Sequence, residues 1–224
     1  MSTNLANKVE NELLPNLTRE TAKLLQSNQN KLSKIRWHSQ ESNTDEGYSN
    51  LAKKLCLKAY NKIKEDNNID LSVEITDLKL TFKQKKTNEE YQTKIELKSS
   101  KTKSPIPGST FRSLDINTWV IFCYRKNDKI FEIRYGRYHL GMNISTHETI
   151  QDRSPRPKLK FENFQKTNEN PQTVKKVKSE NWLDEYADAA INRVLDPQSH
   201  SWQDDFIKSL IKKVLKNPKK FKKI

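Results

Sequence analysis

Two carboxylates and a lysine in the middle of the chain, Asp77, Glu96 and Lys98, could act together on one substrate. A hard divalent cation takes oxygen ligands, usually one or two carboxylates together with phosphate and water. Such a cation polarises a phosphoryl oxygen and lowers the pKa of the attacking water. Asp77 and Glu96 would supply the carboxylates and the backbone carbonyl of Leu97 a further oxygen, while Lys98 would orient the water or stabilise charge on the phosphorus. The chemistry that these residues indicate is phosphodiester hydrolysis.

The three residues fall in segments with the alternating pattern of β-strands. Apolar and polar residues alternate in residues 71–82, which we interpret as one strand, and again in residues 91–100. If the apolar residues share one face, Asp77, Glu96 and Lys98 all point to the opposite face. The same alternation directs Glu74 away from Asp77 and excludes it from the site. Convergence requires the two strands to pair in a register that brings Asp77 next to Glu96.

The balance of charge indicates a polyanionic partner. The chain of 224 residues has 42 basic and 28 acidic residues, a formal net charge of +14 and a pI near 9.6. Nucleic acid is the leading candidate and an anionic membrane surface the second. No run of 18 apolar residues and no apolar leader region is present, so we expect a cytoplasmic protein without a membrane span. Cys56 and Cys123 lie in apolar runs and are expected to be buried free thiols.

Thr76-Asp77, followed by Glu96-Leu97-Lys98, resembles the signature of the PD-(D/E)xK nuclease superfamily, the site of many type II restriction endonucleases. The resemblance covers residues 46–135: a helix, the Asp strand, the Glu-x-Lys strand and a buried strand. Thr76 stands where a proline is common. The resemblance implies that Asp77 and Glu96 bind Mg²⁺, with Mn²⁺ as a substitute, and that Lys98 is the catalytic lysine. Glu46 is a candidate for the auxiliary acidic residue that some members carry.

Helices and strands are expected around this site in an order that favours an α/β (α+β) fold. Residues 5–35 predict amphipathic helices interrupted near Pro15, which form either a dimerisation arm or a layer packed on the core. The other expected elements, in chain order, are a helix at 46–66, the strands at 71–82 and 91–100, a strand buried on both faces at 119–124, its hairpin partner at 129–135, a short strand at 159–161, a helix at 181–195 and a last helix from 201.

We interpret the whole chain, residues 1–224, as a single nuclease domain. Its expected fold is a restriction endonuclease-like core, with a small mixed central sheet flanked by helices, plus N-terminal and C-terminal helices. The expected parts are a helical N-terminal arm at 1–40, the catalytic core at 44–145, a basic connection at 146–180, and C-terminal helices with a basic tail at 181–224.

Two basic segments are candidates for DNA contacts. One follows the Glu-x-Lys strand directly and contains two prolines and a glycine, which predict a loop, and the other is the basic connection. Arginine can bind guanine edges with two hydrogen bonds, whereas lysine mostly contacts phosphate. Solvated basic loops are the alternative interpretation. The candidate residues are Lys101, Lys103, Ser109, Thr110, Arg112, Arg153, Arg156, Lys158 and Lys160.

We therefore expect a Mg²⁺-dependent endodeoxyribonuclease that hydrolyses double-stranded DNA. The resemblance implies a type II site-specific enzyme that attacks in line with a metal-activated water and leaves a 5′-phosphate. It would act as a homodimer, so that two sites cut the two strands of a palindrome. One alternative is a structure-selective or repair nuclease of the same fold. The other is a non-enzymatic basic nucleic-acid-binding protein in which the three residues form only an exposed charged face.

Overall fold

The structure is a computed structural model that describes residues 5–37, 46–64, 68–75, 77–108, 115–127, 129–143, 158–171, 188 and 202–216. Its contacts divide the chain into two compact units. The first comprises residues 1–106, 115–142 and 159–176, and the second comprises residues 107–114, 143–158 and 177–224. Within the second unit the helix α7 (Trp202–Lys216) forms where a last helix is expected, whereas the helix expected at 181–195 lies outside the described residues. The single domain expected over 1–224 stays a prediction.

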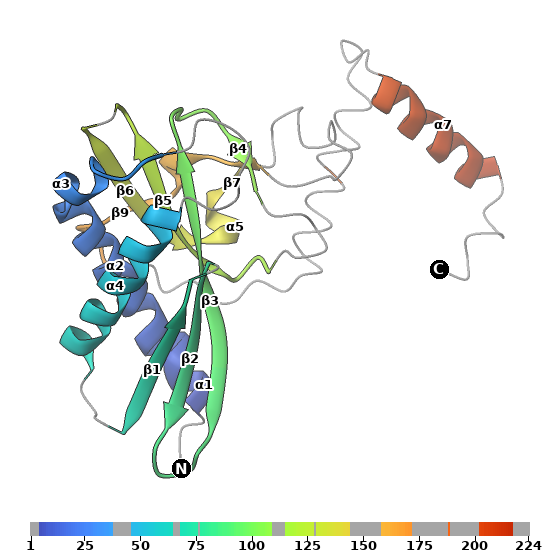
Figure 1. The fold of residues 1–224 in the computed structure, drawn as a ribbon. Coiled ribbons are helices and arrows are strands. Elements are labelled where there is room, and N and C mark those ends of the chain that lie inside the picture. The colour runs from blue at the N-terminus through green and yellow to red at the C-terminus, as the bar shows by residue number, and fades with distance from the viewer. Residues whose placement is uncertain are drawn as a thin grey trace. The chain divides into compact units, whose positions relative to one another are not determined.

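The first unit is built on a six-stranded sheet (Figure 1). Its strands, in spatial order, are β1 (Ile69–Glu74), β2 (Leu78–Gln84), β3 (Glu90–Ser100), β5 (Trp119–Arg125), β6 (Phe131–Arg137) and β9 (Gln165–Lys166). The β3–β5 pair is parallel and the other pairs are antiparallel. The expectation of a mixed α/β fold with a mixed central sheet is thereby confirmed.

Burial along the strands follows from their composition. In β2 the apolar residues Leu78, Leu80 and Phe82 are fully buried, while the residues between them face the other side of the sheet. The apolar and aromatic run of β5 is buried from Trp119 to Cys123, so this central strand is covered on both faces, as its continuous apolar sequence predicts.

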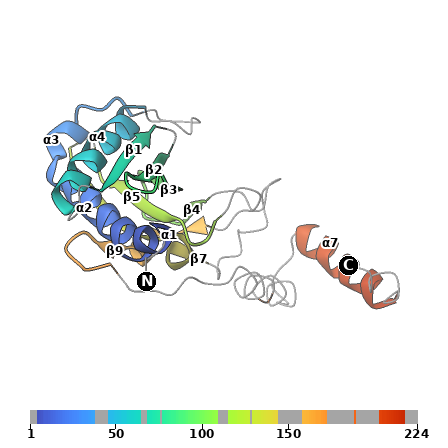
Figure 2. The same cartoon turned by 90° about the horizontal axis from the view of Figure 1, so that it is seen from below.

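Helices cover one face of the sheet (Figures 1 and 2). The helices α1 (Leu5–Lys8), η1 (Val9–Leu13, a π-helix), α2 (Leu14–Ser27), α3 (Gln29–Leu32) and α4 (Glu46–Ile63) contribute to one hydrophobic core with the sheet. Leu5, Leu17 and Leu32 are buried in it, so residues 5–32 pack on the core and do not form a free arm.

The interruption expected near Pro15 is wrong. The segments α1, η1 and α2 follow one another without a break, and Pro15 occupies the first turn of α2. Because the residues before Pro15 are already helical, its missing backbone N–H removes one bond from the helical ladder. The wider turn of η1 directly before it is the local adjustment that the chain makes.

Aromatic side chains cover part of the opposite face. Phe122 of β5 packs edge-on against Phe161 and Phe164, with ring centroids 5.3 and 5.8 Å apart. Phe161 belongs to the 3-10 helix η2 (Phe161–Asn163), which stands where part of the strand at 159–161 is expected. That expected strand is therefore wrong beyond Leu159. The helix α5 (Tyr138–Gly141) and the two-residue strands β4 (Ile106–Pro107), β7 (Met142–Asn143) and β8 (Lys158–Leu159) lie outside the six-stranded sheet.

None of the helices in the described ranges combines the length and the apolar character that a membrane span requires.

Candidate functional site

Asp77 lies in a turn and not within a strand. Residues 71–82, which the alternation predicts as one strand, are two antiparallel strands, with Glu74 of β1 paired to Lys79 of β2. Asp77 has a φ of 44°, a left-handed conformation that aspartate tolerates better than most residues. The expected continuous strand is therefore wrong, and the site residue sits where the hairpin enters β2.

The register of the next strand pair brings Asp77 beside the Glu-x-Lys sequence. Leu78 pairs with Ile95, so Asp77, one position before Leu78, comes level with Glu96. The backbone N–H of Leu97 donates a hydrogen bond of 3.2 Å to Asp77 Oδ1. This bond ties the Asp77 carboxylate to β3 and limits its orientation.

Glu96 and Lys98 form an ion pair on the sheet face that the helices do not cover. Lys98 Nζ lies 2.6 Å from Glu96 Oε1, and the side chains are 23% and 3% exposed respectively. On the neighbouring strand β5, Val120 and Phe122 stand level with them, and both are fully buried. A buried carboxylate is stable only when it is paired and hydrogen-bonded, so Lys98 supplies charge compensation that Glu96 needs.

The oxygen donors at this site suit a hard cation that keeps most of its coordinated water. Asp77, in the turn before β2, and Glu96, on β3, offer carboxylate oxygens, and Leu97 offers a backbone carbonyl between Glu96 and Lys98. Mg²⁺ is commonly held by one or two carboxylates, with water and phosphate completing its shell. Within the described ranges no group of three or more His, Cys, Asp and Glu residues could hold a metal ion. Glu46 is the first residue of α4, and its side chain lies outside the described part.

Lys103, one of the expected DNA contacts, is held by the protein itself. Its ammonium group lies 3.3 Å from Glu132 and 3.6 Å from Glu162. It also lies over the rings of Tyr124 and Phe161, 5.2 and 5.5 Å from their centroids. These contacts attach the segment after β3 to the sheet, which is a structural role.

The other expected DNA contacts are only partly described. Lys101 and Lys160 are exposed, whereas Lys158 is half-buried and burial lowers the pKa of its ammonium group. Ser109, Thr110, Arg112, Arg153 and Arg156 lie outside the described residues.

Two lysines that the sequence interpretation missed stand on the same face as the carboxylates. Lys79 and Lys94 are directly opposite each other on β2 and β3. Lys79 follows Asp77 by two positions and Lys94 precedes Glu96 by two, so strand alternation was sufficient to find them. Both line a pocket of about 330 Å³ that also includes Tyr91, Gln92, Thr93, Asn117 and Thr118.

A buried arginine fixes one wall of this pocket. Arg137 is 5% exposed, donates a hydrogen bond of 2.8 Å to the carbonyl of Asn117, and stacks on Trp119 at 5.0 Å. Burial lowers the pKa of its guanidinium group, while Glu10 and Asp115 oppose that shift. Across the pocket, Tyr91 donates a hydrogen bond of 2.7 Å to Glu10, and burial, reinforced by this bond, raises the pKa of the phenol.

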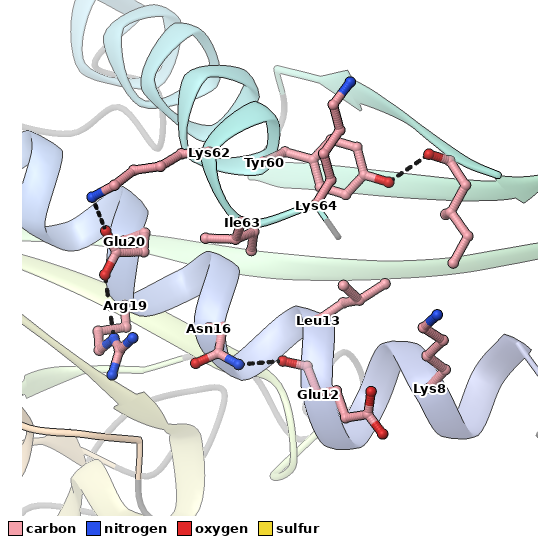
Figure 3. A pocket seen from close by; sticks show the side chains of 11 residues that line it. Lys8, Glu12, Leu13, Asn16, Arg19, Glu20, Tyr60, Lys62, Ile63 and Lys64 are labelled. Carbon is pink, nitrogen blue, oxygen red and sulfur yellow. Dashed lines mark hydrogen bonds and ion pairs between the residues drawn. The ribbon is translucent and has the colours of Figure 1, made fainter. Parts of the chain in front are cut away.

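A pocket of about 490 Å³ lies elsewhere, between the N-terminal helices, α4 and the start of β1 (Figure 3). Glu20 lies there between Arg19 and Lys62, 3.4 and 3.0 Å away. Burial alone would raise the pKa of this carboxyl group, but the lysine hydrogen bonds bring the net pKa below its usual value. This pocket is larger, yet Asp77, Glu96 and Lys98 do not line it. We therefore place the candidate site on the Asp77 face, where the reactive groups are.

Comparison with protein-family models, curated protein sequences and solved structures finds no match to this chain.

Proposed function

We propose that this chain is a Mg²⁺-dependent endodeoxyribonuclease that hydrolyses double-stranded DNA as a sequence-specific restriction enzyme. The observation that carries the proposal is the hydrogen bond from the Leu97 N–H to Asp77, which joins Asp77 to the Glu96–Lys98 strand on one sheet face. Two adjacent carboxylates and an ammonium group are the groups that phosphodiester hydrolysis with a divalent cation requires.

The order of elements around the site supports the proposal. Helix α4 precedes the Asp77 hairpin, the Glu-x-Lys strand β3 follows, and the buried strand β5 lies parallel to β3. This is the succession of a helix, the Asp segment, the Glu-x-Lys strand and a buried strand that the resemblance to PD-(D/E)xK nucleases implies. The net charge of +14 is a second support, because a polyanionic substrate is attracted by such a surplus.

Each site residue has a separate role in the proposed reaction. Asp77 and Glu96 would hold a divalent cation, which, when bound, polarises a phosphoryl oxygen and lowers the pKa of water. The Leu97 N–H keeps the Asp77 carboxylate turned towards β3. Lys98 orients the attacking water and places positive charge beside the phosphorus as negative charge develops. In-line attack breaks the bond from phosphorus to the 3′ oxygen and leaves a 5′-phosphate. In a homodimer, two such sites would cut the two strands of a palindrome.

The test compares Asp77→Ala with Asp70→Ala on supercoiled plasmid DNA in Mg²⁺. Asp70 is an exposed carboxylate of the same hairpin, paired with Lys85 at 3.1 Å, so its removal changes charge equally and costs little stability. We expect Asp77→Ala to abolish cleavage but retain DNA binding in Ca²⁺, and Asp70→Ala to cut like the wild type. A fully active Asp77→Ala variant rejects the assignment.

The products of the wild-type digest distinguish the alternatives. Discrete fragments support a sequence-specific enzyme, and a smear indicates nonspecific nuclease action. Cleavage of branched but not plain DNA indicates a structure-selective nuclease. Salt-sensitive binding without cleavage in any divalent metal indicates a non-enzymatic nucleic-acid-binding protein.

A further inference from the structure

Two like charges face each other beside the candidate site. Lys79 and Lys94 form a directly opposed pair in the β2–β3 ladder. Side chains in such a pair have Cβ atoms about 5 Å apart, and like charges there repel each other. Among the described residues, neither ammonium group has an ion pair or side-chain hydrogen bond. On its other side Lys79 faces Glu74 across the β1–β2 ladder, but among the described residues this carboxylate forms no ion pair with either lysine.

The pocket that contains the pair leaves these two cations available. Its two carboxylates have other partners: Glu10 accepts the hydrogen bond from Tyr91, and Asp115 Oδ1 accepts a bond of 2.9 Å from the Asn117 N–H. The remaining lining groups that face the lysines are neutral and polar, such as Gln92 and Thr118. An anion entering the pocket would meet the two lysine charges and hydrogen-bond donors, while the negative charges of Glu10 and Asp115, which also line it, interact with Arg137.

Lys79 and Lys94 lie on the same face of the sheet as Asp77 and Glu96, two residues away along each strand. Residues two apart on a strand are about 6.7 Å apart, and one DNA strand advances about 3.4 Å per nucleotide along the helix axis. Because the strand also winds around that axis, neighbouring phosphates are farther apart than the axial rise, so Lys79 and Lys94 lie near a phosphate adjacent to one placed between Asp77 and Glu96.

We propose that Lys79 and Lys94 together form a phosphate-binding site that holds the cut DNA strand at a phosphate adjacent to the scissile one. The proposal rests on the proposed nuclease function and adds a direction to it: the substrate strand follows the β2–β3 hairpin away from the Asp77 turn. A phosphodiester between the two ammonium groups also removes their mutual repulsion.

The test measures duplex DNA binding in Ca²⁺ as a function of salt for the variant K79A/K94A. Each lost phosphate contact reduces the slope of log affinity against log salt by about 0.9, and because the two lysines share one phosphate we expect a reduction of about 0.9 and roughly 8-fold weaker binding at 0.1 M salt. The matched control is K54A/K58A, which removes two exposed lysines from α4, the helix on the other face of the sheet. Its slope should equal that of the wild type. Lys79→Arg/Lys94→Arg keeps both charges and should keep the wild-type slope.

The outcomes separate this proposal from the nuclease function. An unchanged slope in K79A/K94A, with its thermal midpoint intact, rejects the phosphate site even if the protein cuts DNA. Should K79A/K94A unfold, the milder variant Lys79→Gln/Lys94→Gln takes its place, and an unchanged slope in that variant rejects the site. A reduced slope in K79A/K94A, together with a wild type that cuts no DNA in any divalent metal, supports the phosphate site and rejects the nuclease function. A wild type that does not bind duplex DNA rejects both.

Discussion

Replacing Lys98 with methionine should destabilise the protein because Lys98 compensates the buried charge of Glu96. Their ion pair is 2.6 Å long, with Glu96 almost fully buried and Lys98 about one-quarter exposed. Breaking a fully buried pair costs about 3–5 kcal/mol, and breaking an exposed pair about 0.2–1 kcal/mol. With one partner buried and the other partly in water, we expect Lys98→Met to cost about 2 kcal/mol. For a chain of this size that corresponds to a decrease of about 4–8 °C in Tm.

The measurement is a double-mutant cycle with Lys98→Met, Glu96→Gln and their combination, followed by thermal and urea unfolding without metal. The matched control is the pair Lys83 and Glu90 on the same hairpin, 3.3 Å apart, with each side chain half exposed. Lys83→Met should cost less than about 0.5 kcal/mol. Added Ca²⁺ should raise the Tm of Lys98→Met more than that of the wild type, because a cation held by Glu96 would supply the missing positive charge.

Two results would contradict this reasoning. If Lys98→Met unfolds within about 0.5 kcal/mol of the wild type, water must compensate Glu96 and the pair is not effectively buried. If the coupling energy of the Glu96–Lys98 cycle equals that of the Lys83–Glu90 cycle, burial adds nothing to the interaction. Either result would remove the structural reason for a strong Glu96–Lys98 interaction.

Two further predictions concern His139 and Gly141, which both belong to the short helix α5. Burial lowers the pKa of His139 below 6.5, although its hydrogen bond to the Ile116 carbonyl opposes the shift. The unfolded chain then binds a proton that the folded protein resists, so stability should fall as pH drops below 6.5, by at most about 1.4 kcal/mol per pH unit. Urea unfolding at pH 7.5 and 5.5 should show this loss in the wild type and a smaller one in His139→Gln. Gly141→Ala would place a Cβ 2.0 Å from the Phe164 ring, and such overpacking should cost about 1–3 kcal/mol in thermal unfolding, whereas an unchanged Tm would mean that the ring moves freely.

Strand alternation predicted which side chains share a face of the sheet, but it did not predict the turn that contains Asp77. The buried residues Leu78, Leu80 and Phe82 lie on one face, as their spacing requires. Between Val73 and Leu78, however, the buried apolar positions change from odd to even, and Ile75 is 38% exposed. A change of phase cannot occur within one regular strand, so this shift was the local signal for the hairpin.

The roles of individual lysines could be predicted only where local spacing decides them. Alternation predicts that Lys79 and Lys94 share the face of the site, because each lies two positions from one of its carboxylates. The role of Lys103 depends on Glu132, Glu162 and aromatic rings far along the chain. A basic loop has the same sequence pattern whether its lysines meet phosphate or distant carboxylates of the same protein, so the pattern alone could not separate the two.

The β2–β3 hairpin has a consequence for how the candidate site assembles during folding. Asp77, Glu96 and Lys98 belong to one antiparallel hairpin, whereas β3 and β5 pair only after the intervening chain is closed into a loop. Hairpins form in about 1–10 μs, and pairings between distant segments are slower because more chain entropy is lost first. The relative placement of the two carboxylates is thus encoded by local contacts. Weakening the parallel β3–β5 pairing would lower the amount of folded protein but would leave Asp77 beside Glu96 in the molecules that fold.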